Sequence, residues 1–168
     1  MISIDSPIVS SCGLNSATPV KLTLRNSSMT TLMNIPVMYR IDGGSWITET
    51  IASLPGNTTL QYLFSATANL SAYGSHLIET KVAYAGDSFH ENDTLSVRIV
   101  NAPVITLFPY LENFESGNGF WYTGGTASSW EYGTPASAKI KAAASGSKAW
   151  KTRLSGNYND LEYSYLYS

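Results

Sequence analysis

Charged side chains are scarce in this sequence, and their scarcity excludes several kinds of partner. Asp, Glu, Lys and Arg together make up 13% of the 168 residues, and the formal net charge is -2. Binding to a nucleic acid or to an acidic membrane surface depends on clustered positive charge. We therefore expect no nucleic-acid partner, and the polar surface has to come from Ser, Thr, Asn and Gly.

Cysteine is almost absent as well, because Cys12 is the only one. A single cysteine allows neither an intramolecular disulfide nor a cysteine metal cluster. A catalytic thiol needs a neighbouring histidine, and the sequence has only His76 and His90. The sequence also lacks a G-x-S-x-G elbow, an H-E-x-x-H motif and a phosphate-binding loop. We therefore predict no catalytic residue and a protein that is not an enzyme.

Long hydrophobic runs are missing too. The sequence contains no apolar stretch of the length that spans a membrane, and Met-Ile-Ser-Ile-Asp at its start lacks the basic and apolar regions of a signal peptide. We therefore expect no membrane span, and we interpret Met1 as an added start or a boundary.

Alternating apolar and polar side chains are what the first hundred residues do contain. Val20, Leu22 and Leu24, for example, take one side of a predicted strand, and the residues between them take the other. Short strands are predicted at 2–9, 19–26, 35–41, 45–51, 58–64, 75–84 and 94–100, with a crossing segment or single helical turn at 68–73. This spacing is typical of an Ig-like β-sandwich, which we predict over residues 1–101.

A second domain is predicted over residues 102–168. Pro103 marks its boundary, because proline cannot donate a hydrogen bond to a sheet ladder, and aromatic residues become dense after Leu107. Strands are predicted at 110–114, 120–123, 129–132, 148–154 and 161–167, with a loop over 133–147. A short helix over 136–144 is the alternative to part of that loop. The predicted fold class is therefore all-β.

Two groups of motifs resemble known families. The segments VKLTLRN and NIPVMYRIDGG, followed by a PG turn, FSATANL and NDT, resemble the CARDB-like, immunoglobulin-fold repeats of large secreted bacterial proteins. The later motifs FESG, SSWEYGTPAS and GSKAWKTRLSGNY resemble the start of jelly-roll modules related to MAM domains. The family module continues beyond these motifs, so the resemblance implies a partial, truncated jelly-roll β-sandwich after the Ig-like one.

The resemblance also implies a location, a metal and partners. It implies a noncatalytic accessory region of an exported bacterial protein at the outer cell surface or outside the cell, sent out by the type IX secretion route. Related modules hold a structural calcium, and Glu115 is the one residue that we carry over to such a site. The implied partners are neighbouring domains of the same polypeptide.

Exposed aromatic rings offer a second kind of partner. Trp and Tyr side chains stack on sugar rings, and the candidates for binding a polysaccharide or cell-surface glycan are Trp121, Trp130, Tyr132 and Tyr158. Packing in a core is the alternative role for these side chains.

Two functions remain open from the sequence. The leading one is a noncatalytic extracellular spacer, adhesion or interaction region, and the alternative is a carbohydrate-binding accessory module of a secreted hydrolase or peptidase. We also expect Tyr163, Tyr165 and Tyr167 to lie on a strand of an incomplete sheet, with an exposed face or a second chain over it.

Overall fold

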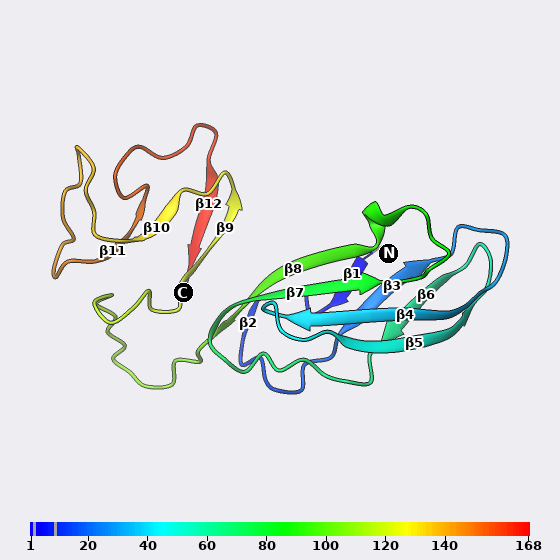
Figure 1. Cartoon of the computed structure of the whole chain (residues 1–168). Coiled ribbons are helices and arrows are strands. Elements are labelled where there is room, and N and C mark those ends of the chain that lie inside the picture. Colours follow the sequence, from blue (N-terminus) through cyan, green and yellow to red (C-terminus); the bar gives the residue numbers. More distant parts are fainter. Residues whose placement is uncertain (2, 9) are drawn as a thin grey trace. The chain divides into compact units, whose positions relative to one another are not determined.

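The chain is all-β in the computed structural model, which describes every residue except Ile2 and Val9. It divides into two compact units, Met1–Asn101 (unit 1) and Ala102–Ser168 (unit 2). Among the described residues, the helical structure is one short 3-10 turn, η1 (His90–Asn92), and no helix is long and apolar enough to cross a membrane (Figure 1).

Unit 1 is a sandwich of two sheets. One sheet has the order β2 (Ser11–Cys12), β8 (Thr94–Ala102), β7 (Gly74–Val82), β4 (Leu32–Ile41) and β5 (Ile47–Leu54). The other has the order β1 (Ser3–Ser6), β3 (Lys21–Arg25) and β6 (Thr59–Leu63). Strands β1, β3 and β6 correspond to A, B and E of an immunoglobulin domain, and β4, β7 and β8 to C, F and G. The predicted Ig-like sandwich is confirmed.

The core of unit 1 lies between these sheets. Alternation along β3 buries Leu22 and Leu24, and β4 buries Val37 and Tyr39 in the same way. The ring of Tyr39 meets that of Phe64 edge to face, with centroids 4.8 Å apart. The predicted strands from 19–26 to 94–100 correspond to β3 to β8. The first predicted strand, 2–9, holds β1, but its residues 2 and 9 lie outside the described part.

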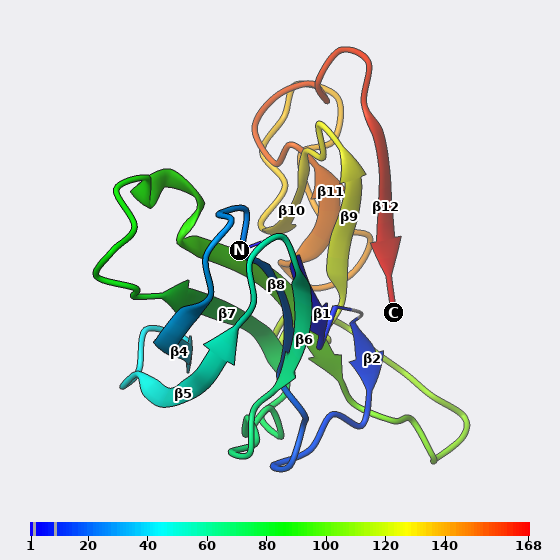
Figure 2. The same ribbon diagram turned by 90° about the vertical axis from the view of Figure 1, so that its right-hand side faces the viewer.

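Unit 2 has two small antiparallel sheets and few buried apolar side chains. Strand β9 (Tyr122–Thr126) pairs with β12 (Tyr163–Tyr167), and β10 (Trp130–Gly133) pairs with β11 (Ala149–Thr152). Figure 2 shows β9 in yellow beside β12 in red. Pro135 is fully buried and Ala102 is 7% exposed, whereas large apolar side chains such as Leu107, Phe108 and Leu111 are exposed.

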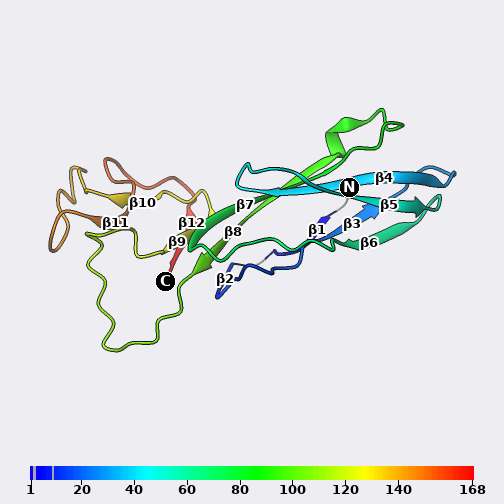
Figure 3. The ribbon, with the colours of Figure 1, turned by 60° about the horizontal axis from the view of Figure 1, so that its bottom comes forward.

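Three strand predictions in unit 2 hold and two need correction. The strand predicted at 129–132 overlaps β10, which ends one residue later, and the strands predicted at 148–154 and 161–167 contain β11 and β12. The strand predicted at 110–114 is wrong, because this segment belongs to a long irregular loop between β8 and β9 (Figure 3), where Phe114 adopts a left-handed φ of 62° instead of an extended one. The strand predicted at 120–123 begins later, at Tyr122, because Phe120 also has a positive φ. The alternative helix over 136–144 is not formed.

Candidate functional site

An exposed row of tyrosines covers one side of the small sheet β9–β12. Side chains alternate along β12, so Tyr163, Tyr165 and Tyr167 share one side and are 68%, 38% and 44% exposed, while the residues between them are half-buried. The antiparallel register places Tyr122 of β9 directly opposite Tyr167. We call these four side chains the tyrosine face. The expectation of an exposed face on this strand is confirmed.

The four rings contact one another in sequence. The rings of Tyr122 and Tyr167 stack with centroids 5.0 Å apart and planes 17° apart. Tyr163 and Tyr165 meet edge to face at 5.0 Å, and Tyr165 and Tyr167 lie tilted at 6.0 Å. A Cβ atom on Gly124 would lie 2.9 Å from the Tyr167 ring, so glycine at this position leaves room for the stack. The rings therefore form a continuous array.

The half-buried carboxylate of Glu162 anchors the start of β12. Glu162 accepts hydrogen bonds from the backbone N–H and the hydroxyl of Ser129, at 3.0 and 2.5 Å, from the N–H of Asn159 at 3.2 Å, and from the hydroxyl of Ser164. These donors, led by the Ser129 hydroxyl, lower the pKa of Glu162 to about 2. The anionic carboxylate therefore ties β12 to the residue that precedes β10.

Each side chain of the tyrosine face combines an apolar ring with a hydroxyl group. The hydrogen bond with Tyr163, followed by burial and the nearby Tyr167 hydroxyl, raises the pKa of Tyr165 above its ordinary value. The Tyr165 hydroxyl therefore stays protonated at neutral pH and can donate or accept a hydrogen bond. Aromatic rings with such hydroxyls pack against apolar side chains of a protein or stack on sugar rings.

Two of the predicted ligand-binding residues pack around one phenylalanine in unit 2. The half-buried Trp121 meets Phe114 edge to face, with centroids 5.1 Å apart. Tyr132 donates its hydroxyl hydrogen to the carbonyl oxygen of Phe114 at 2.5 Å, and its ring lies 5.8 Å from that of Trp150. These contacts favour the alternative role in core packing, and ligand binding by Trp121 and Tyr132 stays a prediction.

The other two predicted residues differ in exposure. Trp130 is half-buried on β10, opposite Thr152 of β11. Tyr158 is 67% exposed in the loop between β11 and β12. An exposed, coplanar pair of Trp130 and Tyr132 would favour sugar binding, but both side chains are half-buried. Glycan binding therefore stays a prediction for these residues, and Tyr158 is the most accessible of them.

The predicted calcium residue serves as an anchor for a loop. The carboxylate of Glu115 accepts hydrogen bonds from the N–H groups of Ser147 and Lys148, at 2.9 and 2.8 Å, and from the Ser147 hydroxyl at 2.8 Å. The Lys148 N–H leads the donors that lower the pKa of Glu115. Calcium needs six to eight oxygen ligands. The surroundings of Glu115 supply mainly N–H donors, so they do not fit calcium, and we derive no role for a metal.

The described residues contain no group of three or more His, Cys, Asp or Glu side chains that could hold a metal ion.

Tyr122 is the member of the tyrosine face that the sequence did not indicate. Its strand was placed too early in the chain, and only the pairing of Gly124 with Tyr165 brings Tyr122 opposite Tyr167. The period-two tyrosines of β12 were the only signal for this surface.

Comparison with known proteins gives one informative similarity. No protein-family model matches the chain. An alignment over 143 residues, which covers 82% of the chain, shows 29% identity to part of Bacillopeptidase F from Bacillus subtilis (strain 168). The chain spans 9% of that protein's length. It is therefore similar to a small segment of a much larger protein whose name describes a peptidase.

Proposed function

We propose that this chain is a noncatalytic interaction region of a large multidomain protein that acts outside the cell, and that the tyrosine face is its contact surface. The observation that carries this proposal is the array of four contacting rings, three of them more than one-third exposed, on the two-stranded sheet β9–β12. Exposed apolar patches of this kind mark surfaces that bind another molecule.

The composition and the comparison support the same proposal. A surface with few charges and many hydroxyl groups suits contacts that do not depend on electrostatic attraction. Similarity to 9% of a much longer protein agrees with a region that works beside other domains. The relation to CARDB-like and MAM-related modules, the spacer or adhesion role and the type IX route belong to this proposal as well.

Hydrogen–deuterium exchange tests the proposed contact. Exchange at residues 163–167 is compared between this chain alone and the longer polypeptide that contains it. We expect slower exchange in the longer polypeptide and no slowing in a variant that carries Tyr163→Ser and Tyr165→Ser. Phe89→Ser is the matched control, because it removes a similarly exposed ring from unit 1. Equal exchange in the chain alone and in the longer polypeptide would refute a contact at this surface.

Carbohydrate binding is the second candidate, and the exposed phenols of Tyr158 and Tyr163 favour it. The rings of Tyr163 and Tyr165 stand at 80° to each other, so a sugar would stack on one ring at a time. A glycan array probed with the wild-type chain, Tyr158→Ser and Tyr163→Ser tests this role. Binding that both variants retain, or its absence from the wild-type chain, would remove carbohydrate from the proposal.

A further inference from the structure

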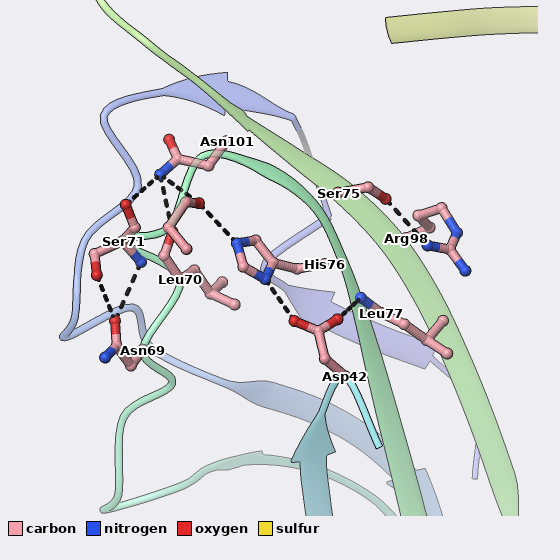
Figure 4. Close-up of polar contacts among 10 residues, drawn as sticks. Asp42, Asn69, Leu70, Ser71, Ser75, His76, Leu77, Arg98 and Asn101 are labelled. Carbon is pink, nitrogen blue, oxygen red and sulfur yellow. Dashed lines mark hydrogen bonds and ion pairs between the residues drawn. The ribbon is translucent and has the colours of Figure 1, made fainter. Parts of the chain in front are cut away.

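A buried histidine in unit 1 lies between two hydrogen-bond acceptors. His76, near the start of β7, is 7% exposed. Its Nδ1 lies 2.7 Å from Oδ2 of Asp42, in the turn after β4, and its Nε2 lies 2.9 Å from the carbonyl oxygen of Ala72 (Figure 4). Neither a carboxylate nor a carbonyl oxygen can donate a hydrogen bond. Both ring nitrogens of His76 must therefore donate.

Only the protonated ring satisfies both contacts. A neutral imidazole carries one N–H and one lone pair, so it would direct a lone pair at either Asp42 or Ala72. The imidazolium carries two N–H groups and matches both acceptors. Either neutral tautomer leaves one of the two acceptors without a donor, so this conclusion does not depend on which ring nitrogen is assigned the hydrogen.

The surroundings of Asp42 hold its carboxylate in place for this contact. Its second oxygen, Oδ1, accepts the backbone N–H of Leu77 at 2.7 Å, and its own N–H donates to the Leu77 carbonyl oxygen at 2.9 Å. The charged groups that face His76 from the neighbouring elements are Asp42 itself and, acting on Asp42, Arg98 of β8. Arg98 also donates to the hydroxyl of Ser75 at 3.1 Å.

The carbonyl side of the contact belongs to a loop that a buried asparagine also holds. Asn101, fully buried on β8, directs its Nδ2 at the carbonyl oxygens of Leu70, Ser71 and Ala72, at 2.9, 3.2 and 3.3 Å (Figure 4). Several carbonyl oxygens of the loop thus converge on two donors, the Asn101 amide and His76. Loss of the His76 proton removes one of these two donors.

We propose that unit 1 takes up a proton on His76 when it folds, and that loss of this proton at alkaline pH weakens the attachment of residues 69–73 to the end of the sandwich. The neutral ring keeps its hydrogen on Nδ1, because the hydrogen bond to the Asp42 carboxylate is charge-assisted. The Nε2 lone pair then faces the Ala72 carbonyl oxygen, and the loop opens more readily at Ala72. The Asn101 amide and the Leu70 N–H, which donates to the Asn15 carbonyl oxygen at 3.0 Å, still hold the loop.

The pKa of the ring agrees with this geometry. Burial lowers the pKa of His76, but the hydrogen bonds to Ala72 and Asp42 outweigh it and raise the pKa above its ordinary value. A raised folded-state pKa gives stability that is fully present below the unfolded value of about 6.5 and is lost as the pH rises through the folded value. In this window the unfolding equilibrium constant rises by up to about tenfold per pH unit.

Nuclear magnetic resonance of the ring nitrogens in the full chain tests the proposal directly. At pH 7 we expect both nitrogens of His76 to carry hydrogen. With rising pH, we expect the change to a single N–H to coincide with faster amide exchange, corrected for the intrinsic effect of pH, at residues 69–73. A neutral single tautomer of His76 at pH 6 would overturn the proposal, as would a loop whose corrected exchange does not change with this titration.

A stability measurement with a matched control provides the second test. Urea unfolding is followed by the amide signals of β7 and β8 in the wild-type chain, in His76→Gln and in His90→Gln, which removes the other, 72% exposed imidazole. We expect the loss of stability between pH 6 and 9 to disappear in His76→Gln and to persist in His90→Gln. The same pH dependence in all three would contradict the proposal, and if His76→Gln does not fold, the resonance experiment decides alone.

Discussion

The carboxylate of Glu49 in unit 1 links the two sheets of the sandwich through several hydrogen bonds, so its replacement should destabilise the unit. Glu49 of β5 accepts hydrogen bonds from the Tyr62 hydroxyl at 2.7 Å, from the Ser65 hydroxyl at 2.6 Å, and from the N–H groups of Ser65 and Ala66 at 3.0 and 3.1 Å. It therefore ties the edge strand of the larger sheet to the end of β6 in the smaller sheet. The change that we consider is Glu49→Gln.

The magnitude follows from the pKa of this carboxyl group. Burial raises the pKa of Glu49, but the hydrogen bonds from Ser65, Tyr62 and Ala66 lower it by more. The net result is a pKa of about 2, compared with the ordinary 4.5. Complete linkage of such a shift corresponds to roughly 3 kcal/mol at neutral pH. Because the carboxylate is only half-buried, solvent screening reduces this contribution, and we expect Glu49→Gln to cost about 1–2 kcal/mol.

The sign of the pH dependence is fixed by the lowered pKa. The stability that Glu49 contributes is present above pH 4.5 and is lost as the pH falls from 4.5 towards 2. In Glu49→Gln this acid-dependent loss should shrink, and Tyr62, whose pKa burial and the Glu49 carboxylate raise to about 12, should ionise at a lower pH.

Urea unfolding of unit 1 at pH 7 and pH 3 measures the effect, and a separate alkaline titration of the Tyr62 ring by nuclear magnetic resonance gives a second signal. Glu91→Gln is the control, because Glu91 is exposed on η1. Equal unfolding midpoints for Glu49→Gln and the wild-type chain at pH 7 would refute the reasoning. So would an acid dependence that is the same in the two proteins.

Three further predictions concern packing and pairing. Leu22→Ala should destabilise unit 1 by about 2–5 kcal/mol in urea unfolding because Leu22 is fully buried, whereas Leu63→Ala at a 59% exposed position should have little effect. Gly125→Ala should disrupt β9–β12 and reduce the near-ultraviolet circular dichroism of the tyrosine face, because the φ of Gly125 is 94° and a Cβ there would lie 2.2 Å from a carbonyl oxygen of β12. Gly117→Ala should leave this signal unchanged, because the space around Gly117 is open. Glu162→Gln should weaken the acid-dependent loss of structure in unit 2 between pH 4.5 and 2, measured by tryptophan fluorescence.

The sequence predicted unit 1 well because its strands record their burial in their composition. The alternation of Val20, Leu22 and Leu24 appears in the structure as one buried side of β3 and of the residue that precedes it. The contact of His76 with Asp42 could not be predicted in this way. The two residues are 34 positions apart, and only the pairing of β4 with β7 brings the turn and the ring together.

Unit 2 was predicted less well because local composition does not decide whether a strand finds a partner. Residues 110–114 have the apolar character of a strand, but no described strand pairs with them, and Phe114 has a positive φ. The aromatic candidates show the same difficulty. Aromatic character alone made both Trp121 and Tyr158 candidates for ring stacking, yet the first packs on Phe114 and the second is exposed.

Each unit is stabilised internally in a different way, and this difference makes the proposed function testable. Unit 1 rests on a closed apolar core, whereas unit 2 relies on carboxylates that accept several hydrogen bonds: Glu115 fixes the loop at Ser147, and Glu162 fixes the start of β12. The exposed rings of the tyrosine face lie outside these anchors. Replacing Tyr163 or Tyr165 should therefore change binding far more than folding, so a loss of contact in those variants can be attributed to the surface itself.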